Sequence, residues 1–391
     1  MEKNYQPTIY ACFVGYIVQA IVNNFVPLLF LTFHEAYGIP LLAITFLVTV
    51  NFSIQLAVDV ASVLFVDRIG YRASMVIAHA SCALGMVMLA FLPELLPDPY
   101  IGILISVVLY AIGGGLLEVL VSPVMEACPT PNKEAAMSLL HSFYCWGHVG
   151  VVLISTAFFA LFGIRNWKIL ACLWAIVPAC NMAAFSRVPI ASLIQEGETG
   201  MSIPELFRTK LFWILLLLMI CAGACEQAVS QWASTFAEQG LGVTKTLGDL
   251  AGPMFFAILM GTSRAIYGKL GSRLPLETCI FGCGLMCLAS YLIISLSPVP
   301  ALSLLGCGIC GFAVGIFWPG TFSMAASAMP NGGTALFALL ALGGDVGCSG
   351  GPTLVGAMAN VFGGDLHKGI LCGVVFPILL IAGLKLKKRA G

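Results

Sequence analysis

Long apolar runs alternate with short polar stretches along the whole chain, and this pattern predicts membrane-spanning helices. A helix of about 20 apolar residues crosses the roughly 30 Å hydrocarbon core of a bilayer. Twelve runs are long enough, and the polar stretches between them are too short to hold a soluble domain. The predicted helices cover residues 7–33, 42–65, 74–92, 100–124, 135–162, 168–185, 211–236, 247–268, 276–296, 300–324, 333–360 and 367–386.

Composition agrees with this pattern. Of the 391 residues, 60% are hydrophobic and only 9% are charged, whereas a soluble domain carries about 25% charged residues. The formal net charge is zero, so bulk charge gives no reason to expect a nucleic-acid partner. We therefore expect an all-α integral membrane protein, acting as a monomer, whose main surroundings are the lipid bilayer.

Orientation follows from the distribution of lysine and arginine. If the amino terminus is cytoplasmic, 14 of the 18 basic residues lie on the cytoplasmic side, as the positive-inside rule requires. This predicts an even number of spans in the inner membrane, with both termini in the cytoplasm.

The two halves of the chain resemble each other at three places in the same order, which indicates an internal repeat. We therefore expect two pseudo-symmetric six-helix bundles, over residues 1–186 and 211–391, joined by a cytoplasmic loop at 187–210. The paired segments are TFHE at 32–35 with TFAE at 235–238, VDRIGYR at 66–72 with GKLGSRLP at 268–275, and GGGLLEVLVSP at 113–123 with CGFAVGIFWP at 310–319.

The loop after the second predicted helix carries a family resemblance. Residues 67–72 read DRIGYR and resemble the loop signature of the major facilitator superfamily, although Val63 and Phe65 replace its first glycine and its leucine. The resemblance implies a gating role for Asp67, Arg68 and Arg72, which would hold one state of a carrier closed at the cytoplasmic face.

The fourth predicted helix carries a second resemblance, to one family within this superfamily. Residues 117–123 read LEVLVSP and are similar to the Leu-Glu-x-x-x-Asn-Pro stretch of the fucose, galactose and glucose proton-symporter family. In that family the glutamate, here Glu118, contributes to sugar binding and proton coupling. Two departures stand out, because Ser122 replaces the family asparagine and Asn23 stands where the family has an aspartate in its first helix.

Acidic side chains within the predicted spans are the strongest functional signal. A charge in the membrane interior costs a few kcal/mol, so it normally faces a bundle interior or a water-filled path. Glu118 lies about 12 Å deeper than Glu126 at 1.5 Å per residue, and Glu226 falls in the same register as Asn23. We expect Glu118 and Glu226 to face each other and to couple a cation, with Asp345 either on the same path or bonded to a neighbouring helix. Asp59 could instead belong to the cytoplasmic gate.

Amide, imidazole and aromatic groups accompany these acids and suit a ligand rich in hydroxyl groups. Amides donate and accept hydrogen bonds at once, and an indole face can pack against a sugar ring. Arg264 is expected near a helix end, where it can reach the interface or pair with an acid. The candidate substrate-binding residues are Gln19, Asn23, Asn24, Glu118, His141, Tyr144, Glu226, Gln227, Gln231, Trp232 and Trp318.

Taken together, these residues predict a secondary transporter that takes up a sugar or sugar-like polyol with a cation, by alternating access. The resemblance implies a proton as that cation, and sodium is the alternative. A carrier of drugs or small organic acids and, from another class, a membrane enzyme or sensor remain as rivals. The sequence has no phosphate-binding loop, and its CxxC pair, Cys307 and Cys310, and its GxSxG match at 347–351 both lie within predicted membrane helices. Neither a cofactor nor a resident metal is therefore expected.

Overall fold

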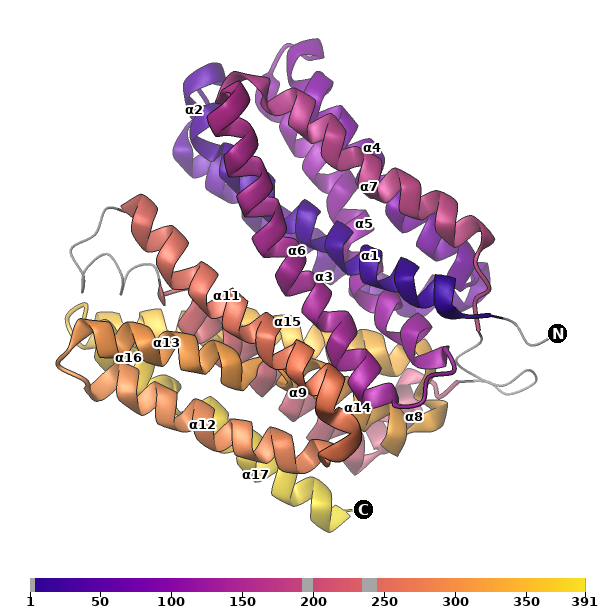
Figure 1. Ribbon diagram of the computed structural model, residues 1–391, viewed down its shortest axis with the longest axis vertical. Coiled ribbons are helices and arrows are strands. Elements are labelled where there is room, and N and C mark those ends of the chain that lie inside the picture. Colours follow the sequence, from indigo (N-terminus) through magenta and orange to yellow (C-terminus); the bar gives the residue numbers. More distant parts are fainter. Residues whose placement is uncertain (1–3, 192–199, 234–244, 391) are drawn as a thin grey trace. The chain divides into compact units, whose positions relative to one another are not determined.

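The computed structural model describes residues 4–191, 200–233 and 245–390, except for the side chains of some helical residues, including Asp67. Within these ranges the chain is helical, with short connections and no strands (Figure 1). Each of the twelve predicted apolar runs corresponds to helix. Residues 234–236 of the seventh run, and the TFAE segment, lie outside the described residues. Ten helical segments of the described chain are long and apolar enough to cross a membrane, and the prediction of an all-α membrane protein is confirmed.

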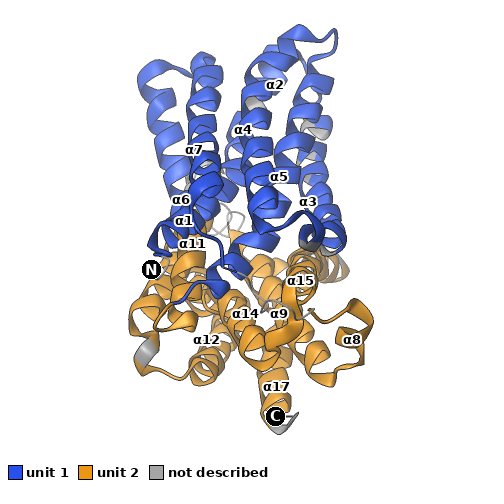
Figure 2. Ribbon diagram, turned by 90° about the vertical axis from the view of Figure 1, so that its right-hand side faces the viewer, with its two compact units in different colours: residues 1–129, 146–197 blue, residues 130–145, 198–391 orange. Residues whose placement is uncertain are grey.

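The chain forms two compact units, shown in different colours in Figure 2. The first unit comprises residues 1–129 and 146–197. In it, α4 packs against α5 and α7, and α3 and α1 each pack against α5. Its helices are α1 (Gln6–Asn24), η1 (Val26–Leu29), α2 (Phe30–Tyr37), α3 (Leu41–Ile69), α4 (Tyr71–Leu95), α5 (Pro99–Ala127), η2 (Ile164–Asn166), α7 (Trp167–Arg187) and the second part of α6 (Lys133–Phe162).

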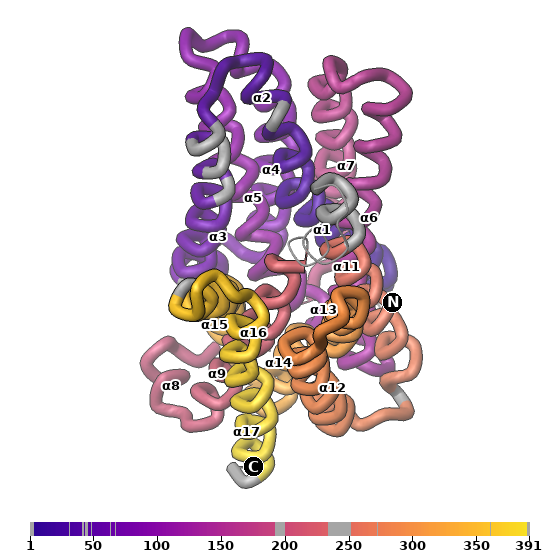
Figure 3. The backbone as a smooth tube through the Cα atoms, turned by 90° about the vertical axis from the view of Figure 1, so that its left-hand side faces the viewer, coloured from indigo at the N-terminus to yellow at the C-terminus, as the bar shows by residue number. Residues whose placement is uncertain are grey.

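The second unit comprises residues 130–145 and 198–391. Here α9 packs against α15 and α17, and α13 packs against α11 and α12 (Figure 3). The first part of α6 belongs to this unit, whereas the predicted boundary within 187–210 stays a prediction. The helices are α8 (Ile203–Arg208), α9 (Lys210–Ser230), α11 (Lys245–Leu270), η3 (Gly271–Arg273), α12 (Leu276–Leu296), α13 (Pro300–Val314), α14 (Phe317–Ala328), η4 (Pro330–Gly332), α15 (Gly333–Val361), α16 (Leu366–Gly373) and α17 (Val375–Ala390).

Three of the predicted spans are interrupted near prolines, which the apolar pattern alone did not reveal. One is the twelfth, divided into α16 and α17 with Pro377 in the first turn of α17, and the other two are the first and the tenth. The first run is divided into α1, η1 and α2, with Pro27 just after the end of α1, and the tenth is divided into α13 and α14, with Pro319 in the first turn of α14. Proline has no N–H for the carbonyl four residues earlier, and its ring clashes with that carbonyl. The breaks at Pro27 and Pro319 fall beside candidate site residues, and backbone carbonyls that lose their helical donor there can bind side chains instead.

Candidate functional site

In the first unit, Glu118 on α5 is held by Gln19 on α1. The Nε2 of Gln19 donates to Oε2 of Glu118 at 3.1 Å. Gln19 is buried and Glu118 is half-buried. Two residues predicted from the sequence are thus brought together. The amide is a suitable partner, because it stabilises the carboxylate without adding a second charge to the apolar interior.

A set of amides on α3, which the sequence pattern alone did not indicate, extends this site. Nδ2 of Asn51 donates to Oδ1 of Asn23 at 3.2 Å, and Nε2 of Gln55 donates to the same oxygen at 2.8 Å. Their spacing of four residues places both side chains on one face of α3. Asn24, by contrast, donates its Nδ2 to the Ala20 carbonyl of its own helix at 2.8 Å, so of the neighbouring asparagines it is Asn23 that joins the set.

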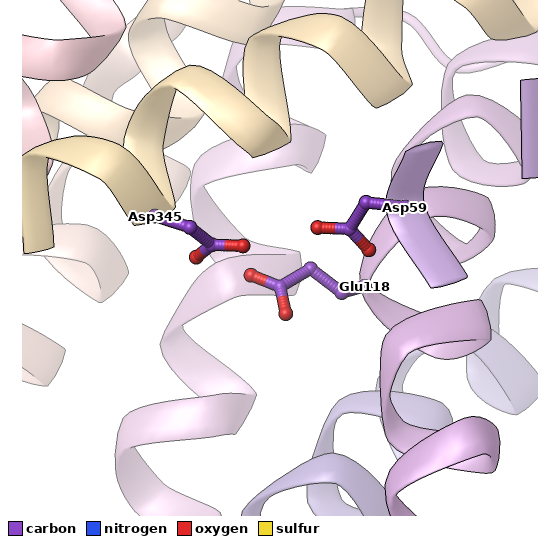
Figure 4. A group of neighbouring side chains, drawn as sticks. All are labelled: Asp59, Glu118 and Asp345. Carbon is purple, nitrogen blue, oxygen red and sulfur yellow. The ribbon is translucent and has the colours of Figure 1, made fainter. Parts of the chain in front are cut away.

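Asp59 lies beside Glu118. Its side chain is fully buried, and oxygen atoms of the two carboxylates lie within 4.8 Å of one another (Figure 4). This places Asp59 next to the carboxylate of α5, and its alternative role in a cytoplasmic gate stays a prediction. Gly115 allows this approach, because a Cβ there would lie 3.0 Å from the Gln55 Cα.

In the second unit, Glu226 on α9 forms an ion pair with Arg264 on α11. The Nη2 of Arg264 lies 3.3 Å from Oε2 of Glu226, and the side chains are only 5% and 15% exposed. The option that Arg264 reaches out to the membrane interface is wrong, whereas pairing with an acid is what the structure shows. Glu226 also accepts from Nε2 of Gln227 at 3.3 Å.

The remaining donors of Arg264 satisfy groups of two other helices. Its Nε donates to the Gly315 carbonyl at 2.7 Å, and its Nη1 donates to the His141 carbonyl at 3.2 Å. Gly315 is four residues before Pro319, which cannot supply the usual helical donor to that carbonyl. The guanidinium, with donors in a rigid fork, therefore closes the gap between α13 and α14 and holds Glu226 in place.

Aromatic candidates of the second unit lie on α6 and α14. The rings of His141 and Phe322 are 5.9 Å apart, and Trp318 meets Phe322 edge to face at 6.3 Å. The indole of Trp318 also packs on α15, where a Cβ added to Gly344 would lie 2.2 Å from it. Tyr144 is half-buried one turn after His141. Together, His141 and Trp318 belong to one packed cluster.

The end of α9 carries a short chain of amides. Nε2 of Gln231 donates to Oε1 of Gln227 at 3.3 Å, and the Ser230 hydroxyl donates to the same oxygen at 3.2 Å. Gln231 is exposed, and Trp232 is half-buried with an indole N–H that has no hydrogen-bond acceptor. These groups can exchange hydrogen bonds with a polar ligand without first breaking a helix.

Asp345 lies on α15, in a stretch of glycines that packs closely against α9. A Cβ on Gly347 would lie 2.0 Å from the Ile220 carbonyl oxygen, and one on Gly223 would lie 2.2 Å from the Gly344 carbonyl oxygen. Asp345 itself is half-buried. Its role in cation coupling stays a prediction, as does the expected apposition of Glu118 and Glu226, which belong to different units.

The predicted gating residues have unlike surroundings. Arg72 donates its Nη1 and Nη2 groups to the carbonyls of Phe185 and Val188, at 2.9 and 2.8 Å. It thereby binds the carboxyl-terminal end of α7, where a helix leaves carbonyls without partners. Arg68 is exposed at the end of α3, and the Asp67 side chain lies outside the described residues. Gating by these three residues stays a prediction.

Comparisons with solved structures show the same fold. FucP, described as the E. coli fucose:proton symporter, has a structure in an outward conformation that matches with a TM-score of 0.83 and 13% identity, over 98% of this chain and 99% of that one. The proton:xylose symporter XylE matches with a TM-score of 0.78 and 12% identity, over 98% and 95% of the chains. The human organic anion transporter MFSD10 matches with a TM-score of 0.74 and 14% identity, over 98% and 100%.

At such low identity these structures are evidence for the fold alone, and the search of curated proteins finds no match. A family model supplies the assignment, because the model described as Major Facilitator Superfamily matches residues 11–383. This multi-pass membrane protein belongs to the major facilitator superfamily of transporters.

Proposed function

We propose that the protein takes up a sugar or sugar-like polyol by symport with a cation, using alternating access. The observation that carries the proposal is the carboxylate of Glu118, held in the first unit by the Gln19 amide at 3.1 Å. A half-buried carboxylate with a neutral partner can bind a cation and a hydroxyl group at the same position. Its charge, costly within a membrane, is then neutralised by the ion that drives uptake.

The polar groups around the acids suit a neutral ligand with many hydroxyls. Each hydroxyl is both donor and acceptor, and amides such as Gln19, Gln227 and Gln231 meet both needs. The indoles of Trp318 and Trp232 offer flat faces of the kind that pack against a sugar ring. Two structural neighbours, FucP and XylE, are described as symporters of fucose and xylose with protons, which supports the same class of substrate here.

An organic-anion carrier is the second candidate, because one structural neighbour is described as an organic anion transporter and Arg264 is a buried cation. The contacts of Arg264 argue against this role. Its guanidinium already bonds to Glu226 and to the Gly315 and His141 carbonyls. An anionic substrate would have to displace at least one of these partners, and the displaced carboxylate would be left buried without its counter-charge.

Uptake by proteoliposomes tests the proposal. The purified protein is reconstituted and offered labelled fucose, galactose, glucose, xylose, a linear polyol and a small dicarboxylate, under imposed proton and sodium gradients separately. We expect one sugar or polyol to accumulate above its external concentration, with protein-free liposomes as the blank. Accumulation of the dicarboxylate, with no competition by any sugar or polyol, would contradict the proposal.

A matched pair of variants tests whether the aromatic cluster around Trp318 takes part in sugar binding. Trp318→Leu removes an indole from that cluster and should raise the KM for the accumulated sugar. Trp146→Leu removes an indole that is 41% exposed on α6 and should leave KM unchanged. Equal effects of both substitutions would show that the indole of Trp318 has no specific part in binding.

A further inference from the structure

Three buried amide oxygens of the first unit accept no hydrogen bond. They are Oε1 of Gln19, Oδ1 of Asn51 and Oε1 of Gln55, in side chains that are only 4%, 5% and 2% exposed. A buried acceptor without a donor costs about 1–3 kcal/mol, so three of them in one neighbourhood call for an explanation.

The hydrogen bonds made by the amide nitrogens explain why the oxygens are left over. Asn51 and Gln55 turn their NH2 groups to Oδ1 of Asn23, and Gln19 turns its NH2 group to Glu118. Rotating any of these amides by half a turn would place two acceptor oxygens against each other. An ionised Glu118 can only accept, so it fixes the orientation of the Gln19 amide, and Oδ1 of Asn23 holds the NH2 groups of Asn51 and Gln55.

The same helices bring two carboxylates to this neighbourhood. Gln55 and Asp59 are four residues apart on α3, which places them on one face, and carboxylate oxygens of Asp59 and Glu118 lie within 4.8 Å of one another. Two like charges at this distance repel each other in a medium of low dielectric constant. Oxygen acceptors and negative charge thus gather where α1, α3 and α5 meet, which is the chemistry that a hard cation requires.

We infer that the first unit binds a sodium ion through oxygen atoms of Asp59, Glu118 and the amides of Gln19 and Gln55, with Asn23 ordering the Gln55 amide. A proton could bridge the two carboxylates, but it has no bond to offer to several separate amide oxygens. Sodium binds several oxygens at once. Magnesium suits the site less well, because it demands octahedral geometry and gives up its water reluctantly. The role of sodium as the coupling ion rests on the symport proposed above. The binding of sodium itself does not require a transported substrate.

Equilibrium binding of 22Na+ to the purified full-length protein, in sodium-free choline buffer and without sugar, tests the inference. We expect saturable binding that potassium displaces poorly. Asp59→Asn should weaken sodium binding at least tenfold, and Gln55→Leu should weaken it several-fold because it removes an oxygen ligand. Gln55→Glu keeps an oxygen there and should bind at least as well as the unmodified protein. Glu35→Gln, which changes an exposed acid of the same unit, should bind like the unmodified protein.

Protection against thermal unfolding provides a second measurement if one variant is too unstable to assay. Sodium should raise the melting temperature of the unmodified protein and of Glu35→Gln, and should not do so for Gln55→Leu. The absence of saturable 22Na+ binding would overturn the inference. So would equal protection by sodium and choline, or saturable binding of calcium but not sodium.

The outcome is separable from the proposed transport activity. Sugar accumulation driven by a proton gradient alone, together with no sodium binding, would overturn the sodium site and leave sugar symport in place. Sodium binding that is lost in Asp59→Asn, together with no uptake of any sugar or polyol, would support the sodium site and contradict the proposed substrate class.

Discussion

Arg264 donates its Nε–H to the Gly315 carbonyl at 2.7 Å, at the break between α13 and α14. The break exists because Pro319 has no N–H for that carbonyl. One guanidinium thus replaces the missing helical hydrogen bond and neutralises Glu226 on α9. Pro319 thus leaves a carbonyl free to bind Arg264, and Arg264 in turn fixes the position of the Glu226 carboxylate.

This arrangement predicts a large effect of Arg264→Met on stability. The substitution leaves Glu226 buried without a counter-charge, and breaking a buried pair from one side costs about 3–5 kcal/mol. The double variant Arg264→Met/Glu226→Leu should recover much of the loss, because both charges are gone. Thermal unfolding of the purified variants measures this, with the exposed Lys269→Met on the same helix as control. Purely additive single effects would contradict a direct pairing of the two residues.

Close packing of α9 and α15 predicts opposite outcomes for two glycines of α15. A Cβ on Gly347 would lie 2.0 Å from the Ile220 carbonyl oxygen, whereas one on Gly350 would meet nothing within 4 Å. Overpacking typically costs about 1–3 kcal/mol, so Gly347→Ala should lower the melting temperature clearly. Gly350→Ala should leave it unchanged or slightly raised, since alanine favours helix. Similar melting temperatures for the two variants would show that α9 and α15 are farther apart than described.

The contacts of Arg72 predict a local role at the end of α7. Arg72→Ala removes the donors to the Phe185 and Val188 carbonyls, and a hydrogen bond contributes about 0.5–1.5 kcal/mol net. Faster hydrogen exchange of the backbone amides in the last turn of α7 should result. Arg68→Ala, on the exposed end of α3, serves as the control and should not change exchange there. If both variants alter transport equally while exchange in α7 is unchanged, the gating reading is favoured over the structural one.

Acid should loosen the start of α8, which lies outside the membrane-spanning helices. Hydrogen bonds from the Ser202 backbone N–H and from its hydroxyl lower the pKa of Glu205 below the ordinary value of 4.5. A depressed pKa means that the carboxylate's contribution is complete above the unfolded pKa and is lost as the pH falls through the folded one. Hydrogen exchange over residues 202–208 should therefore speed up below the ordinary glutamate pKa, after correction for the intrinsic rate. Glu205→Gln should remove that dependence, and an unchanged profile would argue against the capping interaction.

Much of the fold could be predicted from the sequence, because twelve apolar runs of spanning length leave few alternatives to helices in a membrane. The pairing of Arg264 with an acid was one of the two options that the sequence offered for this residue. The interruptions at Pro27 and Pro319 did not follow from the apolar pattern, since membrane helices often tolerate proline, as Pro123 within α5 shows.

The amides of α3 were missed for a different reason. Asn51 and Gln55 lie in a predicted span with no acid directly beside them, and single amides in such a span usually serve helix packing. Only the structure reveals that they share one acceptor on Asn23. The spacing of Asn51, Gln55 and Asp59 at intervals of four residues was the available signal, because it places three polar groups on one helix face.

The most direct test of the account is a comparison of uphill accumulation and exchange for Glu118→Gln in proteoliposomes, using the solute that the unmodified protein accumulates. Glutamine keeps the size and the hydrogen-bonding ability of the side chain but cannot take up a coupling ion in the same way. We predict that gradient-driven accumulation falls to the protein-free background, while exchange of labelled for unlabelled solute at equal concentrations persists. Accumulation at the rate and level of the unmodified protein would contradict the central claim that this half-buried carboxylate couples transport to a cation.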